Sequence, residues 1–125
     1  MTRTQLDRYQ EMKIQTASPQ ELLLITYDGA LKAMRRARRA CVQGQETKAR
    51  VETMTALSAV MELNSTLNVE AGAIGPPLRQ LYLYVIELLT QALSGLEIKP
   101  LDEAVRIMAS LLESWQQAFD QAQAS

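Results

Sequence analysis

Apolar residues recur every three or four positions along four long stretches of this 125-residue chain. Such spacing places them on one side of an α-helix, and no stretch shows the alternation that is typical of a half-buried strand. Glycines and prolines are few and fall mostly between the stretches. The sequence therefore predicts an all-α fold, in which an antiparallel four-helix bundle is joined by mostly short connections.

Helix-start and helix-stop residues set the expected bounds of the four helices. Ser18 is a preferred N-cap, Pro19 suits the first helical position, and Glu21 completes a capping box. Gly44 and Gly95 are expected to end the first and third helices of the bundle. The helices are thus expected at residues 19–43, 46–67, 77–94 and from 100 to about 122, with a loop at 68–75.

The inward-facing stripe of each helix follows from the same periodicity, and these stripes are expected to form the core. Methionine is a soft gap-filler, so the methionines on the stripes are expected to lie in the core as well. The stripes comprise Leu23, Tyr27, Ala30, Met34, Ala37 and Cys41; Val51, Met54, Leu57, Val60, Met61, Asn64 and Leu67; Leu78, Leu81, Tyr82, Val85, Leu89 and Ala92; and Leu101, Val105, Met108, Leu112, Trp115, Phe119 and Ala122.

The first sixteen residues are polar and precede the firm helix start at Ser18. No cap is recognised ahead of them, so residues 1–16 are expected to form a mobile arm or a short helix of low stability, separate from the bundle at 17–125. Apolar side chains are isolated within this arm: Leu6, Tyr9, Met12 and Ile14. The arm could lay a short apolar edge into a groove on the bundle, or remain a disordered tail.

The expected third helix of the bundle is apolar almost all the way round, because Leu83 and Tyr84 point away from its stripe. A helix of this kind must be covered on every side. Either a crossed packing buries both side chains, or they line an exposed apolar groove for a partner helix.

Two residues of the expected first helix also allow two interpretations. Tyr27 is either a core tyrosine whose hydroxyl bonds near Asp28 or part of a binding surface. Gly29 costs up to about 1 kcal/mol of helix stability, which favours a close helix crossing over a ligand contact.

The residue types argue against several classes of function. The chain has no histidine and one cysteine, Cys41, so it lacks the commonest general base and any zinc-binding constellation. We therefore expect no catalytic residues, no metal and no cofactor, and hence no enzyme. No apolar run is long enough to span a membrane and no signal peptide opens the chain, which favours the cytoplasm.

Charge is divided unevenly along the chain. Residues 1–50 carry ten basic and five acidic side chains, whereas residues 51–125 carry three basic and nine acidic ones. The net charge of −1 argues against a nucleic-acid partner, which needs a dominant basic surface. Four arginines cluster on the first helix, either as a solvated face with ion pairs or as a contact for an acidic partner: Arg35, Arg36, Arg38 and Arg39.

Several short sequence motifs occur along the chain in an order and spacing that are characteristic when taken together. They are Tyr9-Gln10, Ile14, Thr16-Ala17-Ser18-Pro19 with Glu21-Leu22, Tyr27-Asp28-Gly29-Ala30, Ser65-Thr66-Leu67-Asn68 with Glu70 and Gly72, Leu81-Tyr82 with Tyr84, and Trp115 with Ala118. In this order and spacing the chain resembles the flagellar export chaperones called FliS, over about residues 9–119.

The resemblance implies an antiparallel helical bundle that is not an enzyme, and the four apolar stripes predict a monomer. It implies a cytosolic chaperone that binds the disordered C-terminal region of flagellin and prevents its premature polymerisation before export. It also suggests recognition by the flagellar export gate. The residues expected to bind the partner are Tyr9, Ile14, Tyr27, Leu83 and Tyr84. The alternative is a small helical oligomerisation or adaptor module with no export role.

Overall fold

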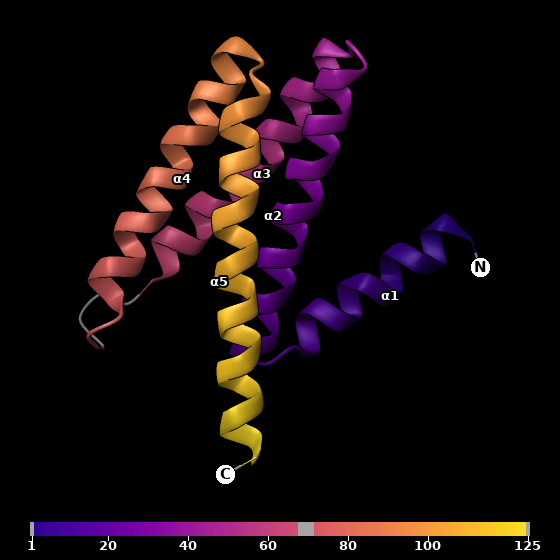
Figure 1. Cartoon of the computed structure of the whole chain (residues 1–125). Coiled ribbons are helices and arrows are strands. Elements are labelled where there is room, and N and C mark those ends of the chain that lie inside the picture. Colours follow the sequence, from indigo (N-terminus) through magenta and orange to yellow (C-terminus); the bar gives the residue numbers. More distant parts are fainter. Residues whose placement is uncertain (1, 68–71, 125) are drawn as a thin grey trace.

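A computed structural model describes residues 2–67 and 72–124, and this part of the chain consists of five helices without a strand. The all-α prediction is confirmed. The helices are α1 (Arg3–Thr16), α2 (Pro19–Val42), α3 (Glu46–Thr66), α4 (Gly75–Gly95) and α5 (Ile98–Ala124). Figure 1 shows α2 to α5 side by side, with α1 leaning away from them.

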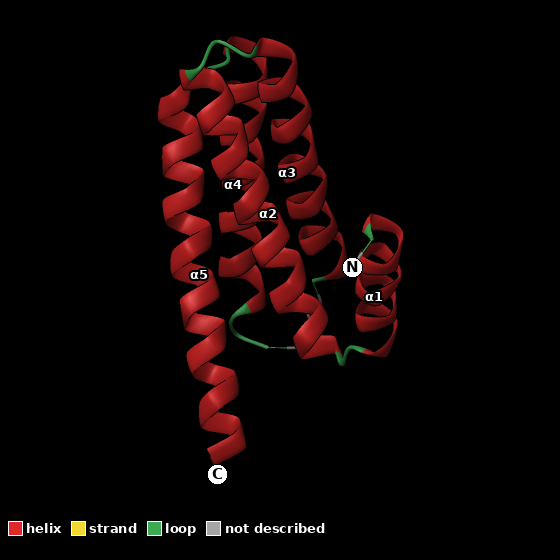
Figure 2. Cartoon of the chain, turned by 90° about the vertical axis from the view of Figure 1, so that its right-hand side faces the viewer, coloured by secondary structure: helices red, strands yellow, loops and turns green. Residues whose placement is uncertain are grey.

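Helices α2 to α5 share one core. α2 packs on α3 and α5, and α4 packs on the same two helices, so each helix has two neighbours. A second view shows the same grouping, with α1 again standing off from the rest (Figure 2). The largest fully buried side chains come from all four helices: Tyr27, Tyr82, Met34, Leu89, Leu101, Met108, Val60, Val85 and Thr53.

Ser18, Pro19 and Gly44 act at the two ends of α2 as the sequence predicts. The Ser18 hydroxyl accepts a hydrogen bond from the backbone N–H of Glu21 at 3.1 Å, and Pro19 opens the helix. This bond satisfies one of the N–H groups that the first turn leaves without an intrahelical partner. Gly44 follows α2 with φ of +72°, a left-handed conformation that glycine adopts without strain.

Three boundary predictions need correction. α1 does have a cap: the Thr2 hydroxyl accepts from the N–H of Gln5, and the Gln5 side chain accepts from the N–H of Thr2. This reciprocal capping box supports a 14-residue helix. α4 runs through Gly95, and Leu96 takes the left-handed conformation instead, with φ of 52°. In the expected loop, residues 68–71 lie outside the described part of the chain, and Gly75 already begins α4.

The predicted stripe of α3 is wrong at three of its seven residues, whereas Val60 is fully buried and Leu57 and Leu67 pack against the core. Val51, Met54 and Met61 are 55%, 55% and 52% exposed, and Leu81 on α4 is also exposed at 38%. Small residues turn inward on α3 instead, chiefly Ala49, Thr53 and Ala56, followed by Val60 and Leu63.

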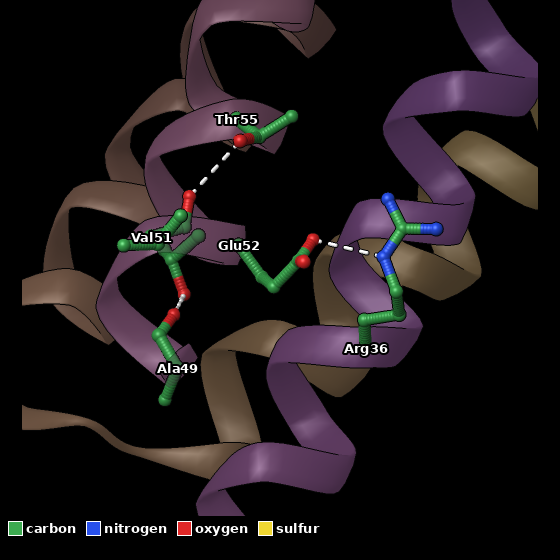
Figure 3. Close-up of polar contacts among 6 residues, drawn as sticks. Arg36, Ala49, Val51, Glu52 and Thr55 are labelled. Atoms are coloured by element: carbon green, nitrogen blue, oxygen red, sulfur yellow. Dashed lines mark hydrogen bonds and ion pairs between the residues drawn. The ribbon is translucent and has the colours of Figure 1, made fainter. Parts of the chain in front are cut away.

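The physical reason is the close packing of α3 against α2. This is the most extensive contact between any two helices, and α2 brings fully buried alanines to the core, such as Ala33 and Ala37. Small side chains let two helix backbones approach, whereas larger ones would hold them apart. The Thr53 hydroxyl stays satisfied by donating to the carbonyl of Ala49 at 2.7 Å (Figure 3).

Two arginines of α2 reach the acidic helices beside it. Arg36 pairs with Glu52 of α3 at 2.9 Å (Figure 3), and Arg38 pairs with Asp102 of α5 at 2.6 Å. Arg35 and Arg39 make no ion pair with the described residues. Basic residues of the first part of the chain therefore pair with acidic residues of the second part. Exposed ion pairs of this kind add little stability.

Candidate functional site

A surface with several exposed apolar side chains lies where α3 and α4 meet. Arg50 of α3 donates to the carbonyl of Leu93 at 2.8 Å, and Arg79 of α4 donates to the carbonyl of Asn64 at 3.3 Å. These two bonds show which side of each helix borders the other. They also place the start of α3 beside the end of α4, and the end of α3 beside the start of α4.

Apolar side chains occupy the same stripes between the two arginine contacts, at spacings of three and four residues. Met54, Met61 and Leu83 are each about half exposed, at 55%, 52% and 51%. Two half-buried residues lie between them. We call this surface the α3/α4 face; it comprises Met54, Leu57, Met61, Leu83 and Ile86.

Tyr84 belongs to a different surface from its neighbour Leu83. Its ring is 41% exposed, and its hydroxyl donates to the Glu103 carboxylate of α5 at 2.7 Å. This bond to the carboxylate raises the pKa of the Tyr84 phenol. Of the two interpretations of Leu83 and Tyr84, the structure favours exposure, but it places the two side chains on different sides of α4.

Tyr27 lies in the core and has no exposed surface. Its hydroxyl shares a 2.5 Å hydrogen bond with the Tyr82 hydroxyl and accepts a 3.1 Å bond from the indole N–H of Trp115. The three side chains link α2, α4 and α5. Asp28, which was the expected neighbour, pairs with Lys32 at 2.8 Å instead.

Burial raises the pKa of both Tyr27 and Tyr82, because desolvation disfavours the phenolate. A raised folded-state pKa gives stability that is complete below pH 10, the ordinary tyrosine value, and is lost as pH rises above it. We expect the free energy of unfolding to fall above pH 10 by up to about 1.4 kcal/mol per pH unit for each tyrosine. Urea unfolding between pH 9 and about 11.5 measures this loss.

The control is the double variant Tyr27→Phe with Tyr82→Phe, which removes both phenols and keeps both rings. Its unfolding free energy should depend less steeply on pH over the same range. Parallel curves for the two proteins would show that these phenols do not set the alkaline limit.

α1 carries exposed apolar side chains and packs little against the rest of the protein. Tyr9 is 61% and Ile14 is 48% exposed. Ile14 borders a surface hollow of about 540 Å³ between α1, α2 and α5, whereas Tyr9 does not. The apolar part of its lining comes from Ile14, Leu24, Ile25 and Leu112, and Gly29 lies among them.

Gly29 does not serve a close helix crossing, so that expectation is wrong. Apart from its two chain neighbours and the backbone of its own helix, a Cβ placed on this residue would meet no atom within 4 Å. Gly29 is exposed in the middle of α2 and faces the hollow. Its helix-weakening effect is therefore not explained by packing within the chain.

The five residues expected to bind a partner do not form one site. Ile14 borders the hollow, Leu83 lies on the α3/α4 face, Tyr84 faces α5, and Tyr27 is in the core. Sequence reasoning missed Met54 and Met61 as surface residues. The only signal in the sequence was their position on one helical stripe, and that spacing fits a core stripe equally well.

Chemical groups for catalysis are sparse in the described part of the chain. It holds no cluster of three or more histidine, cysteine, aspartate or glutamate side chains that could bind a metal ion. Burial raises the pKa of the Cys41 thiol, which disfavours the reactive thiolate. Among the same residues, no helix has the length and apolarity that crossing a bilayer requires.

Five helices and several exposed apolar surfaces define a small helical protein suited to binding other proteins. The family model described as flagellar protein FliS matches residues 1–122. The flagellar secretion chaperone FliS of Bacillus subtilis strain 168 is 30% identical over 113 residues, which cover 89% of this chain and 83% of that protein. The flagellar secretion chaperone FliS of Salmonella typhimurium strain LT2 is 30% identical over 115 residues, covering 90% and 84%. The chain therefore belongs to the FliS family, and the resemblance found in the sequence is confirmed.

Proposed function

We propose that this chain is a cytoplasmic export chaperone that binds the disordered C-terminal region of flagellin and prevents its polymerisation before export. Family membership supports an export chaperone role. The observation that carries the choice of a polypeptide client is the α3/α4 face, where Met54, Met61 and Leu83 stay half exposed. The protein would act by binding alone, without catalysis.

The architecture suits such a role. We propose that α2 to α5 work as an antiparallel four-helix bundle, a rigid platform with its own core, and that residues 1–16 act as a separate arm. An amphipathic client helix can lay its apolar side along a groove between two helices, reading positions i, i+3, i+4 and i+7. Methionine-rich surfaces adapt to such helices because their side chains are flexible.

The client would contact several surfaces rather than one pocket. We propose Tyr9, Ile14, Leu83 and Tyr84 as contacts, with Tyr27 holding α2, α4 and α5 in place from the core. These residues lie on different helices, so one bound segment would have to wrap around the bundle. A disordered client can do this, because it folds as it binds and can cover 1,000–3,000 Å² or so. The flagellar export gate is proposed as a second partner of the loaded chaperone.

The proposal is tested by titrating the full chain with the C-terminal region of flagellin in a calorimeter. We expect 1:1 binding with a clearly negative heat-capacity change and weak dependence on salt, since apolar burial drives it. Flagellin that lacks its C-terminal region is the control and should not bind. No heat of binding with the intact client, or binding abolished by moderate salt, would refute the proposal.

A small oligomerisation or adaptor module is the second candidate, because a second copy of the chain could also cover the α3/α4 face. Light scattering on the isolated protein separates the two functions. The chaperone proposal expects a monomer that becomes a 1:1 complex with client. A stable dimer that ignores the flagellin region would favour the module.

A further inference from the structure

Gly29 is a helix-weakening residue that the fold itself does not need. It lies in the middle of α2 with ordinary helical geometry, since the positive φ angles of the described residues belong to Gly44 and Leu96. Apart from its chain neighbours and the backbone of its own turn of helix, no atom lies within 4 Å of where its Cβ would be. Mid-helix glycine is unfavourable because of its backbone freedom, and no close backbone contact offsets that here.

The space in front of Gly29 is an open hollow of about 540 Å³. Half-buried apolar residues form its floor, namely Leu24 and Ile25 of α2 and Leu112 of α5. Polar groups stand at its edge: the Asp28–Lys32 ion pair, which is largely exposed, and the amide side chains of Gln10 and Gln116. An apolar floor with a few polar groups around it is typical of binding pockets.

One wall of the hollow comes from a helix that packs little against the rest of the protein. α1 supplies Gln10 and Ile14, yet it does not pack extensively against any other helix. Residues 17–18 alone join it to α2. The core therefore does not depend on this wall of the hollow.

We propose that this hollow is an anchor pocket for one large apolar side chain of the client, and that Gly29 keeps it open. The inference rests on the proposed chaperone function. The edge of the hollow is close to neutral, because Asp28 and Lys32 pair with each other and the amides carry no charge. An amphipathic segment fits such a site: its apolar residue enters the floor and its polar residues meet the edge. Buried apolar anchors of this kind carry much of the affinity of protein interfaces.

The test fills the hollow without weakening the fold. Gly29→Leu places a branched side chain in the space that the anchor would occupy, and Gly29→Ala places only a methyl group there. Leucine and alanine both favour helix over glycine, so the unfolding temperature should stay the same or rise in both variants. We expect Gly29→Leu to weaken binding of the flagellin C-terminal region at least tenfold, and Gly29→Ala to change it less than threefold. Gly29→Met, with a more flexible side chain, should fall between them.

The matched control is Gln91→Leu, which adds the same side chain at an exposed position of α4, away from the hollow. It should bind like the wild type. If the wild type binds flagellin and Gly29→Leu binds equally well, the anchor pocket is refuted while the chaperone function stands. If the wild type itself fails to bind, the function is refuted first.

Two other occupants would give different results and would also overturn the proposal. If α1 folds into the hollow, Gly29→Leu should make α1 more sensitive to protease and leave client affinity unchanged. If a second copy of the chain enters it, Gly29→Leu should change the mass measured by light scattering in the absence of client.

Discussion

Replacing Leu89 with alanine should lower the free energy of unfolding by about 3 kcal/mol, because the change leaves a cavity in a tightly packed core. Leu89 is fully buried on α4 and belongs to the core cluster that α2 to α5 share. Leu83 lies on the same helix and is 51% exposed. Leu83→Ala is therefore the matched control, and it should cost less than about 1 kcal/mol. Chemical denaturation of both variants measures the difference.

Comparing the two variants also tests which side of α4 faces the core. Equal losses in the two variants would mean that Leu83 is covered in solution, either by a second copy or by a different packing of α4. A small loss for Leu89→Ala would contradict the core described above.

Two glutamates on the α3/α4 face should weaken flagellin binding by about a hundredfold, or roughly 2.7 kcal/mol. The variant combines Met61→Glu with Leu83→Glu, one substitution on each helix. Both positions are half exposed, so the fold should keep its stability, but a bound apolar segment would then bury two unpaired charges. Calorimetric titration with the flagellin C-terminal region gives the affinity.

The control for this experiment has the same change in charge at other places on the same two helices. Thr55→Glu and Gln91→Glu are both exposed and lie off the α3/α4 face. That double variant should bind within threefold of the wild type. Equal weakening in both double variants would point to general repulsion of the client, and no weakening in either would show that the α3/α4 face takes no part.

Local signals made much of the fold predictable. The Ser18–Pro19–Glu21 start and the Gly44 stop depend on groups within a few residues, and α2 begins and ends within one residue of its expected bounds. The apolar stripe of α2 was also identified correctly at its centre, where Tyr27, Ala30, Met34 and Ala37 are fully buried.

In α3, the periodicity of apolar residues does not decide which side of the helix faces the core. Its apolar residues form two stripes with helical spacing, one small (Ala49, Ala56) and one large (Val51, Met54). Hydrophobicity favours the large stripe, but close packing against the alanines of α2 selects the small one. That choice depends on the partner helix, so the sequence of α3 alone does not contain it.

The α3/α4 face was missed for the same reason, because Met54 and Met61 had been assigned to the core. The link between Tyr27 and Trp115 was not predictable either, since 88 residues separate the two. What the sequence did indicate was an excess of apolar residues on α4, and this excess is what reaches the surface at Leu83.

The placement of the methionines has a consequence for the chemical durability of the protein. Met34 and Met108 have no exposed surface, whereas Met54 and Met61 are open to solvent on the α3/α4 face. Peroxide would convert Met54 and Met61 to sulfoxides before the buried pair, together with Met12 of α1, which is 64% exposed, because oxidation follows access. The core would keep its packing while an apolar surface became polar. An oxidised sample would therefore show an unchanged circular dichroism spectrum, although its α3/α4 face had become less apolar.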